Sequence, residues 1–435
     1  MKIFVLIVVK KIKLKMNETM IFPTLEAVKE ARKSIENVVN YTPLQYNARL
    51  SDKFGANIFL KREDLQPVRS YKLRGAYNKI KSLYNEGKTS DGIVCASAGN
   101  HAQGVAFSCK QLQIKGTIFM PVTTPKQKLE QVEMFGGNFA EIKLVGDTFD
   151  ASKNAALEFA QTSGAAFIHP FDDVQIIEGQ ATLALEILEQ QKENIDFVFI
   201  PIGGGGLASG ISTVFKELSK ETQLIGVEPK GAPSMKTSID NNLNTELQEV
   251  DGFVDGAAVK RVGDLTFEIC RNALADCIPV DEGKICDTIL QLYNKDAIVL
   301  EPAGALSISA LEQYRNQIKG KNVVCIVSGS NNDITRMEEI KERALLYNGL
   351  KHYFMVKFPQ RPGSLKDFVL NVLGENDDIT HFEYTKKNSR ETALAIVGIE
   401  LSSISDFNGL KRRMQNLGYF ESYLNDNPDV LNMLV

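Results

Sequence analysis

Ser70-Tyr71-Lys72-Leu73-Arg74-Gly75-Ala76 places one lysine directly after two hydroxyl-bearing residues and shortly before a glycine, where a helix is expected to begin. A lysine here can do chemistry if its surroundings suppress its positive charge. Most lysines in a chain of this size are solvated stems instead. Lys72 therefore becomes a candidate catalytic residue only through the residues that the rest of the chain places around it.

The composition is that of an ordinary folded protein, and the charge favours small molecules over nucleic acid as partners. Of 435 residues, 43% are hydrophobic and 24% are charged, which suits two or three ordinary domains, and the net charge of −4 gives no basic field for nucleic acid. The six cysteines lack the paired spacing of a zinc site, and the four histidines form no metal-ligand pattern. We therefore expect reduced core cysteines, a cytoplasmic protein, and neither a nucleic-acid nor a membrane partner.

The N-terminus differs from the rest of the chain. An apolar run over residues 3–9 is followed by several lysines. Seven apolar residues cannot span a bilayer, which needs about 20, and a secretory signal carries its charge before the apolar run rather than after it. We expect residues 1–19 to be a disordered N-terminal extension whose deletion leaves activity intact, with Met16 or Met20 as alternative starts.

Short hydrophobic runs alternate with helix-like segments through the next 300 residues. Continuous hydrophobic strands separated by helices indicate parallel sheets with flanking helices, here in two lobes of an α/β protein. Ligands of such sheets bind beyond the carboxyl ends of the strands. The first helix is expected over residues 25–39, and the strands over 58–61, 92–96, 117–120, 141–144, 197–200, 224–227 and 323–327.

Three of these strand ends have an unusual composition. Four glycines between a strand and a helix place bare N–H groups at a helix N-terminus, which suits a phosphate, although a flexible turn has the same composition. Their spacing is that of neither a Walker loop nor a dinucleotide fingerprint. Of the strand-end residues, Ser97 or Asn100 could bind a ligand or could instead be the N-cap of the helix that follows. The three segments are Ser97-Ala98-Gly99-Asn100-His101, Gly203-Gly204-Gly205-Gly206 and Ser328-Gly329-Ser330-Asn331-Asn332.

After about residue 347 the pattern becomes that of a smaller domain. A strand over 353–358 leads through Arg361-Pro362-Gly363-Ser364-Leu365 into a helix. Two strands are expected next, at 381–385 and 393–399, then a helix at 405–417 and a last strand at 421–424. This βαββαβ order is that of a ferredoxin-like domain.

The Lys72 stretch and the glycine run together resemble motifs of pyridoxal-phosphate-dependent enzymes of the tryptophan-synthase β fold, or fold type II, and specifically the serine and threonine dehydratases. The resemblance covers about residues 20–345, the catalytic domain. It implies that Lys72 binds pyridoxal 5'-phosphate covalently, that Gly203, Gly204, Gly205 and Gly206 hold its phosphate, and that Asn100 faces its pyridine hydroxyl. It also implies that the substrate carboxylate is held by Ser97, Ala98, Gly99, Asn100 and His101.

The same resemblance places Ser328, or else Ser330, opposite the pyridine nitrogen. A neutral hydroxyl there limits the electron sink and favours β-elimination. Glu301, in Glu301-Pro302-Ala303-Gly304-Ala305, lies near the site in relatives, but a helix-start carboxylate is an equal alternative. Serine racemases carry an acid/base serine where this chain has Ala98, so racemisation should be poor.

Relatives place a cation where this chain has Glu228, Ala232 and Ser234. Because the last of these is a serine rather than an acid, a monovalent cation or none is expected.

The C-terminal segment resembles the single ACT-like regulatory domain of short-form biosynthetic threonine dehydratases, over residues 350–425. The resemblance implies a threonine ammonia-lyase that converts L-threonine to 2-oxobutanoate and ammonia in isoleucine biosynthesis. It further implies feedback by isoleucine, with valine as an alternative effector, and a homodimer or homotetramer. A serine-preferring dehydratase and a non-catalytic amino-acid sensor are the competing hypotheses.

Overall fold

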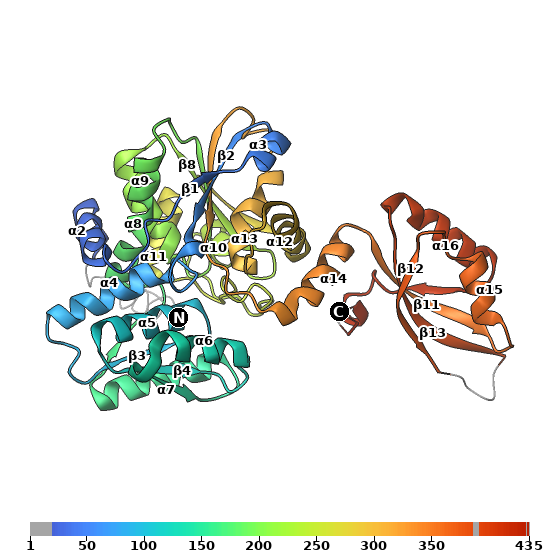
Figure 1. The fold of residues 1–435 in the computed structure, drawn as a ribbon, viewed down its shortest axis with the longest axis horizontal. Helices are drawn as coiled ribbons and strands as arrows, with labels where there is room; N and C mark the ends of the chain where they lie inside the picture. Colours follow the sequence, from blue (N-terminus) through green and yellow to red (C-terminus); the bar gives the residue numbers. More distant parts are fainter. Residues whose placement is uncertain (1–19, 386–390, 432, 435) are drawn as a thin grey trace, which may run out of the picture. The chain divides into compact units, whose positions relative to one another are not determined.

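The computed structural model describes residues 20–385, 391–431 and 433–434, so the predicted extension over residues 1–19 lies outside the described residues. The chain divides into two units (Figure 1). The first contains the chain up to residue 280 together with Val299–Asn332, and the second contains Asp281–Ile298 together with residues from 333 onward. Each unit is described by itself below.

The larger lobe of the first unit is built on a six-stranded sheet. Neighbouring strands are parallel except for the first, which pairs antiparallel with the second. The two central strands are buried over almost their whole length, as the continuous hydrophobic runs predicted. In spatial order the strands are β1 (Leu44–Tyr46), β2 (Asn57–Arg62), β10 (Asn322–Val327), β7 (Phe197–Pro201), β8 (Gln223–Pro229) and β9 (Asp276–Val280).

The smaller lobe has a four-stranded parallel sheet with helices on both faces. Alternate residues of its strand β3 face different helices: Ile93 and Cys95 pack with α5 and α6, and Val94 and Ala96 pack with α7. The strand order is β5 (Ala140–Leu144), β4 (Gly116–Met120), β3 (Ile93–Ala96) and β6 (Ala166–Phe167), and the helices are α5 (Asn100–Leu112), α6 (Lys126–Gly136) and α7 (Phe149–Ser163). The two-lobed α/β prediction is confirmed.

Helix α4 (Lys72–Asn85), which begins at the candidate lysine, crosses α8 (Val174–Gln190) at very close range. A Cβ atom added to Gly179 would lie 2.6 Å from the Gly75 Cα, and one added to Gly75 would lie 2.6 Å from the Ile176 carbonyl oxygen. The glycine three residues after Lys72 is therefore required by backbone packing. This contact fixes the first turn of α4 against α8.

The remaining helices of the first unit complete the layers around the larger sheet. Helix α2 ends at Ile35 rather than at the predicted residue 39, because residues 36–39 form turns ahead of Pro43. None of the described helices combines the length and the apolar character needed to cross a bilayer. These helices are α2 (Leu25–Ile35), α3 (Ala48–Phe54), α9 (Gly206–Leu218), α10 (Ser234–Asp240), α11 (Asp264–Ala273) and α13 (Pro302–Ser309).

The second unit contains the predicted ferredoxin-like domain. Its sheet is antiparallel throughout, and its two helices cover a core that includes Phe354, Val356 and Phe368. The elements are β11 (Lys351–Pro359), α15 (Ser364–Asn371), β12 (Asp378–Tyr384), β13 (Thr392–Glu400), α16 (Phe407–Asn416) and β14 (Phe420–Tyr423), preceded by α12 (Glu282–Asp296) and α14 (Met337–Tyr347) and followed by α17 (Pro428–Leu431). The sheet order β12-β13-β11-β14 confirms the predicted fold.

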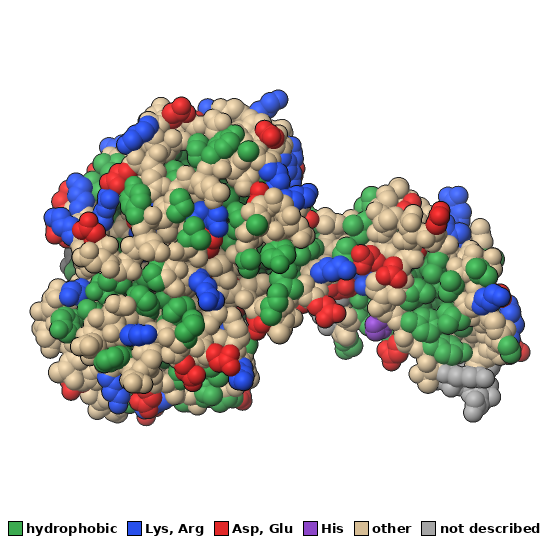
Figure 2. Space-filling model, in the orientation of Figure 1, with side chains coloured by type: hydrophobic (Ala, Val, Ile, Leu, Met, Phe, Trp, Pro, Cys, Tyr) green, Lys and Arg blue, Asp and Glu red, His purple; other side chains and the backbone are tan. Residues whose placement is uncertain are grey.

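Hydrophobic side chains gather on the visible face of this second unit (Figure 2). Large apolar side chains exposed in the unit include Leu365, Val369, Leu370, Phe382 and Tyr384, from α15 and the edge strand β12. Exposed apolar side chains from adjoining elements are a common mark of an interaction surface.

Candidate active site

The Lys72 stretch lies against the loop that follows β10. Ser70 forms an isolated antiparallel bridge with Gly329, and the Tyr71 N–H donates to the Ser328 carbonyl at 3.2 Å. The Ser330 N–H in turn donates to the carbonyl of Arg69, whose φ of 58° turns the chain back. Two of the segments singled out in the sequence are therefore joined through their backbones.

The amine of Lys72 lies in a partly buried position and donates to the carbonyl oxygen of Pro170 at 3.0 Å. Burial lowers the pKa of Lys72 to about 8, although the nearby charge of Glu301 acts in the opposite direction. A lysine amine becomes an effective nucleophile when its pKa falls toward neutrality. The environment thus supplies the condition that the sequence alone could not show.

The glycine run after β7 has the properties of an anion cradle. Gly205 has a φ of +92°, and a Cβ on Gly204 would overlap the Phe171 ring at 2.2 Å, so neither position accepts a larger residue in this conformation. Among the described residues, none accepts a hydrogen bond from the backbone N–H groups of Gly203, Gly204, Gly205 or Gly206. Unpaired N–H groups at the start of α9 fit the phosphate of pyridoxal phosphate.

The loop after β3 meets the loop after β10 through side-chain amides. Asn100 donates to the Glu301 carboxylate at 2.6 Å, and Asn331 donates to the Asn100 carbonyl oxygen at 2.7 Å. The Ser97 hydroxyl accepts the Gly99 N–H at 3.2 Å, and neither Ser97 nor Asn100 caps helix α5. The N-cap alternative for these residues is therefore wrong: the Ser97 hydroxyl bonds within its own loop, and the Asn100 amide bonds Glu301 and Asn331.

Glu301 is a buried carboxyl group at the centre of these contacts. Burial raises its pKa to about 7, the negative charge of Asp255 adds to the effect, and the hydrogen bond from Asn100 opposes it. Glu301 is the N-cap residue of α13, as the helix-start alternative expected, but its side chain makes no capping bond to that helix and is bonded by Asn100 instead. A Cβ on Gly329 would lie 2.4 Å from a Glu301 carboxylate oxygen, so a larger residue there would displace that carboxylate.

The raised pKa of Glu301 predicts a specific dependence of stability on pH. Since the folded-state pKa of about 7 exceeds the ordinary 4.5, the folded protein binds more protons than the unfolded chain between these values, and stability falls as pH rises through this window. Across this pH window the free energy of unfolding of the wild type should fall by roughly 3 kcal/mol because of Glu301, and Glu301→Gln should not show this fall. Denaturant unfolding of cofactor-free protein at about pH 5 and about pH 8 would measure this.

Glu249→Gln is the matched control for this prediction, because it removes the same charge at an exposed position. Its unfolding free energy should run parallel to that of the wild type across the same pH range. If Glu301→Gln also runs parallel, Glu301 does not titrate as its burial requires.

His101 is a buried residue in the first turn of α5. Its Nε2 lies 3.1 Å from the Ile168 carbonyl oxygen, and burial lowers its pKa to about 3, so the ring is neutral. Its Nδ1 is a buried atom without a partner among the described residues. Ala98 packs against the core of the same lobe and offers no hydroxyl.

The two serines after β10 differ in their partners. The Ser328 hydroxyl is buried and donates to the Ala303 carbonyl oxygen at 3.2 Å, whereas Ser330 donates to the Asp64 carbonyl oxygen at 3.4 Å. Ser328 directly follows β10, and its carbonyl oxygen accepts the N–H of Tyr71, the residue next to Lys72. Ser330 instead bonds Arg69, three residues before Lys72. Ser328 remains our prediction for the residue that faces the pyridine nitrogen.

The predicted cation ligands are adjacent, but their oxygens already have partners. The Glu228 carboxylate accepts the backbone N–H groups of Met235 at 2.7 Å and Lys236 at 2.8 Å, and the Ala232 carbonyl accepts the Ser234 N–H. Burial raises the pKa of Glu228 to about 7. In the described part of the chain, no group of three or more His, Cys, Asp or Glu residues could hold a metal.

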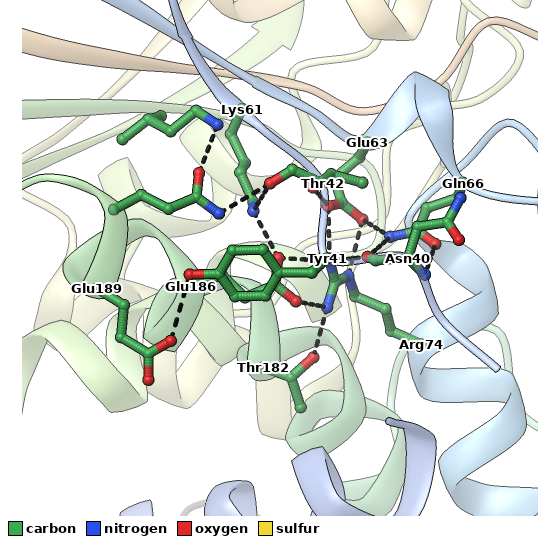
Figure 3. A network of polar contacts seen from close by, with 12 residues as sticks. Asn40, Tyr41, Thr42, Lys61, Glu63, Gln66, Arg74, Thr182, Glu186 and Glu189 are labelled. Carbon is green, nitrogen blue, oxygen red and sulfur yellow. Dashed lines mark hydrogen bonds and ion pairs between the residues drawn. The ribbon is translucent and has the colours of Figure 1, made fainter. Parts of the chain in front are cut away.

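A buried network of four charged side chains holds the first turn of α4 (Figure 3). Arg74 donates to Glu63 with two bonds of 2.8 Å and to Glu186 at 2.6 and 3.0 Å. Lys61 donates to Glu186 at 2.5 Å and to the Thr42 carbonyl oxygen at 2.7 Å. Two positive and two negative groups balance, and they tie the helix that begins at Lys72 to β2 and α8.

Sequence reasoning missed Pro170, Phe171 and this charged network. Pro170 and Phe171 follow a strand of only two residues, and the charged side chains come from segments up to 125 residues apart. A charged residue inside the hydrophobic strand β2, Lys61, was the one local signal that could have indicated a buried ion pair.

Comparisons with known proteins agree with this geometry. Residues 35–329 match the family described as pyridoxal-phosphate dependent enzyme, and residues 342–434 match the C-terminal regulatory domain of threonine dehydratase. The biosynthetic L-threonine dehydratase of Halalkalibacterium halodurans is 52% identical over 94% of this chain and 99% of its own, and that of Bacillus subtilis is 53% identical over 93% and 96%.

Solved structures show the same relationship. The processed form of threonine deaminase isoform 2 from Solanum lycopersicum matches with a TM-score of 0.69 and 40% identity over 74% of this chain and 91% of its own, and maize serine racemase matches with 0.69 and 30% over 75% and 99%. The chain belongs to the pyridoxal-phosphate-dependent enzymes, in the family of biosynthetic threonine dehydratases with a C-terminal regulatory domain.

Proposed function

We propose that this protein is a threonine ammonia-lyase that converts L-threonine to 2-oxobutanoate and ammonia in isoleucine biosynthesis. The observation that carries the proposal is the position of the Lys72 amine, whose pKa is lowered to about 8. The amine bonds Pro170, next to the Phe171 that packs on the glycine run, and it lies near Glu301, the partner of Asn100. The dehydratases of Halalkalibacterium halodurans and Bacillus subtilis, similar over nearly the whole chain, support the substrate.

The residues of the chain divide the chemistry between them. Pyridoxal phosphate, when bound, supplies the electron sink that makes the α-proton of an amino acid removable. Lys72 would hold the cofactor and then accept that proton, because a pKa lowered to about 8 leaves more of its amine neutral near pH 7 than in an ordinary lysine. Gly203 to Gly206 would bind the phosphate. The segment Ser97-Ala98-Gly99-Asn100-His101 would bind the substrate carboxylate.

The reaction balances without an oxidant or reductant. Threonine loses its α-proton and its β-hydroxyl as water, and hydrolysis of the resulting imine returns that water and releases ammonia. Because Ala98 provides no acid on the far side of the α-carbon, elimination is favoured over return of a proton to the opposite face.

A 2-oxo acid assay with L-threonine and L-serine tests the proposal. We expect 2-oxobutanoate from threonine with a higher kcat/KM than pyruvate from serine, and no D-serine by chiral analysis. A higher kcat/KM for serine would identify a serine-preferring dehydratase, and formation of no oxo acid from either would contradict the proposal.

We further propose that isoleucine binds the C-terminal regulatory domain and lowers activity, with valine as the alternative effector. Such regulation requires that the effector bind two states of the protein with different affinity. Isothermal titration calorimetry with each amino acid would measure its binding, and the activity assay with and without that amino acid would measure its effect on turnover. Binding of isoleucine without any change in turnover would exclude feedback.

We also propose a homodimer or homotetramer in the cytoplasm, with at most a monovalent cation near Glu228. The exposed apolar side chains of α15 and β12 support association, and the six buried, free cysteines suit a reducing compartment. Light scattering after size-exclusion chromatography would give the oligomeric state, and a monomer would contradict the proposal.

A further inference from the structure

The glycine run is held from behind by one side chain. The hydroxyl of Thr266, a fully buried residue of α11, donates to the Gly204 carbonyl oxygen at 2.6 Å. The same hydroxyl lies 3.2 Å from the Gly263 carbonyl oxygen, and the Gly263 N–H points to the Gly204 carbonyl oxygen at 3.3 Å. Gly204 oxygen is therefore fixed by two donors from one helix start.

Fixing this carbonyl also fixes an N–H group of the cradle. In a trans peptide the C=O of one residue and the N–H of the next point in opposite directions. When Thr266 holds the Gly204 carbonyl, the Gly205 N–H is aimed away from α11, and no described residue accepts it. The left-handed φ of +92° at Gly205 maintains that orientation.

Space at this contact leaves little freedom for another arrangement. A Cβ on Gly205 would lie 2.8 Å from both Cβ and Oγ1 of Thr266. The close approach shows that the threonine side chain and the glycine backbone are packed directly on each other. A change in the Thr266 side chain should therefore alter the backbone conformation of the glycine run.

Asp172 holds the first turn of α11, on which Thr266 lies. Its carboxylate accepts the backbone N–H groups of Asp264 at 3.0 Å, Leu265 at 3.1 Å and Thr266 at 3.2 Å. The N-cap residue, Gly263, has no side chain to do this, and a Cβ there would lie 2.1 Å from an Asp172 carboxylate oxygen. A residue 92 positions away thus acts as the cap of α11.

Asp172 belongs to the same short segment that receives the catalytic lysine. Pro170 accepts the Lys72 amine, and Phe171 packs on Gly204 and Gly206. One segment therefore connects the lysine, the glycine run and the start of α11.

We propose that Thr266, itself held by Asp172, is a positioning residue that orients the Gly205 N–H toward the phosphate of the cofactor. The proposal rests on the cofactor site proposed above. Thr266 acts through the Gly204 peptide and does not contact the cofactor. Its removal should therefore weaken recognition of the phosphate and leave the rest of the cofactor's binding unchanged.

A comparison of two cofactor forms on cofactor-free protein tests this directly. Calorimetric titration with pyridoxal phosphate and with pyridoxal, which lacks the phosphate, separates phosphate recognition from all other contacts. Thr266→Val keeps the shape of the side chain without the hydroxyl, and should bind pyridoxal phosphate about tenfold more weakly while binding pyridoxal as the wild type does. Thr266→Ser keeps the hydroxyl and should restore affinity to within about twofold of the wild type.

The outcomes separate this inference from the site on which it rests. If wild-type protein binds both forms equally well, the glycine run is not the phosphate site and the proposed function loses its cradle. If the wild type prefers pyridoxal phosphate and Thr266→Val retains that preference, or loses both affinities alike, the role of Thr266 is overturned. A serine variant as weak as the valine variant would also overturn it.

A second variant covers the case in which Thr266→Val does not fold. Asp172→Asn places an amide N–H₂ where one backbone N–H of α11 now finds an acceptor, so the start of the helix should shift. We expect a loss of preference for pyridoxal phosphate over pyridoxal in this variant as well. Retention of the full preference would overturn the proposal.

Discussion

Lys72→Ala should lose both turnover and the visible absorbance of bound cofactor, and this is the largest functional effect that the structure predicts. The Lys72 amine has a pKa lowered by burial to about 8 and donates to the carbonyl oxygen of Pro170. An alanine leaves no nucleophile for the aldehyde and no base for the α-proton. We expect a fall in kcat of several orders of magnitude, with little change in thermal stability.

Two measurements make this prediction sharp. Borohydride treatment of the holoenzyme should fix the cofactor on the peptide that contains Lys72, where mass spectrometry can find it, and Lys72→Ala should yield no such peptide. Lys88→Ala, which removes an exposed lysine shortly after the same helix, should retain both the modified peptide and the activity. Cofactor found on another lysine of the wild type would overturn the assignment.

The parts of this site that the sequence predicts are those written within a few residues. Gly203 to Gly206 form their cradle from their own backbone, and the strand before them is a continuous hydrophobic run. The same holds for the βαββαβ order of the second unit, because β11 and β13 are hydrophobic runs that are each followed by a helix. Local patterns of this kind can be recognised in the sequence even though distant residues such as Thr266 support them in the fold.

The parts that escape the sequence depend on pairs separated by long stretches of chain. Asn100 and Glu301 are 201 residues apart, and Lys72 and Pro170 are 98 apart. Locally, Asn100 has the composition of a helix cap and Glu301 that of a helix-start carboxylate, and folding selects a different partner for each. The strands β1 and β9 were missed because neither is a continuous hydrophobic run: β1 has only three residues, and β9 contains Asp276 and Pro279.

The buried charged network extends this argument to stability. Arg74 and Lys61 are both fully buried, together with Glu63 and Glu186. Such a network is neutral as a whole, but it cannot lose one member without leaving an uncompensated charge in the interior. The network therefore stabilises the fold only when all four charged side chains are present. Arg74, two residues after Lys72, has a structural role in this network.

Arg74→Met should destabilise the first unit by about 3–5 kcal/mol, because two buried carboxylates would lose their shared partner. Arg74→Lys should recover part of this loss, since it restores the charge without the planar fork that bonds Glu63 and Glu186 together. The free energy of unfolding from denaturant titration of cofactor-free protein, followed by circular dichroism, would measure both variants.

Lys33→Met provides the control, because it breaks an ion pair with Glu30 in which both side chains are 71% exposed, and it should cost at most about 1 kcal/mol. An equal effect of Arg74→Met and Lys33→Met would mean that the network contributes no more than a surface pair. Since α4 begins at Lys72, two residues before Arg74, a large loss would also show that the helix carrying this amine is stabilised by charges that do not bond the amine itself.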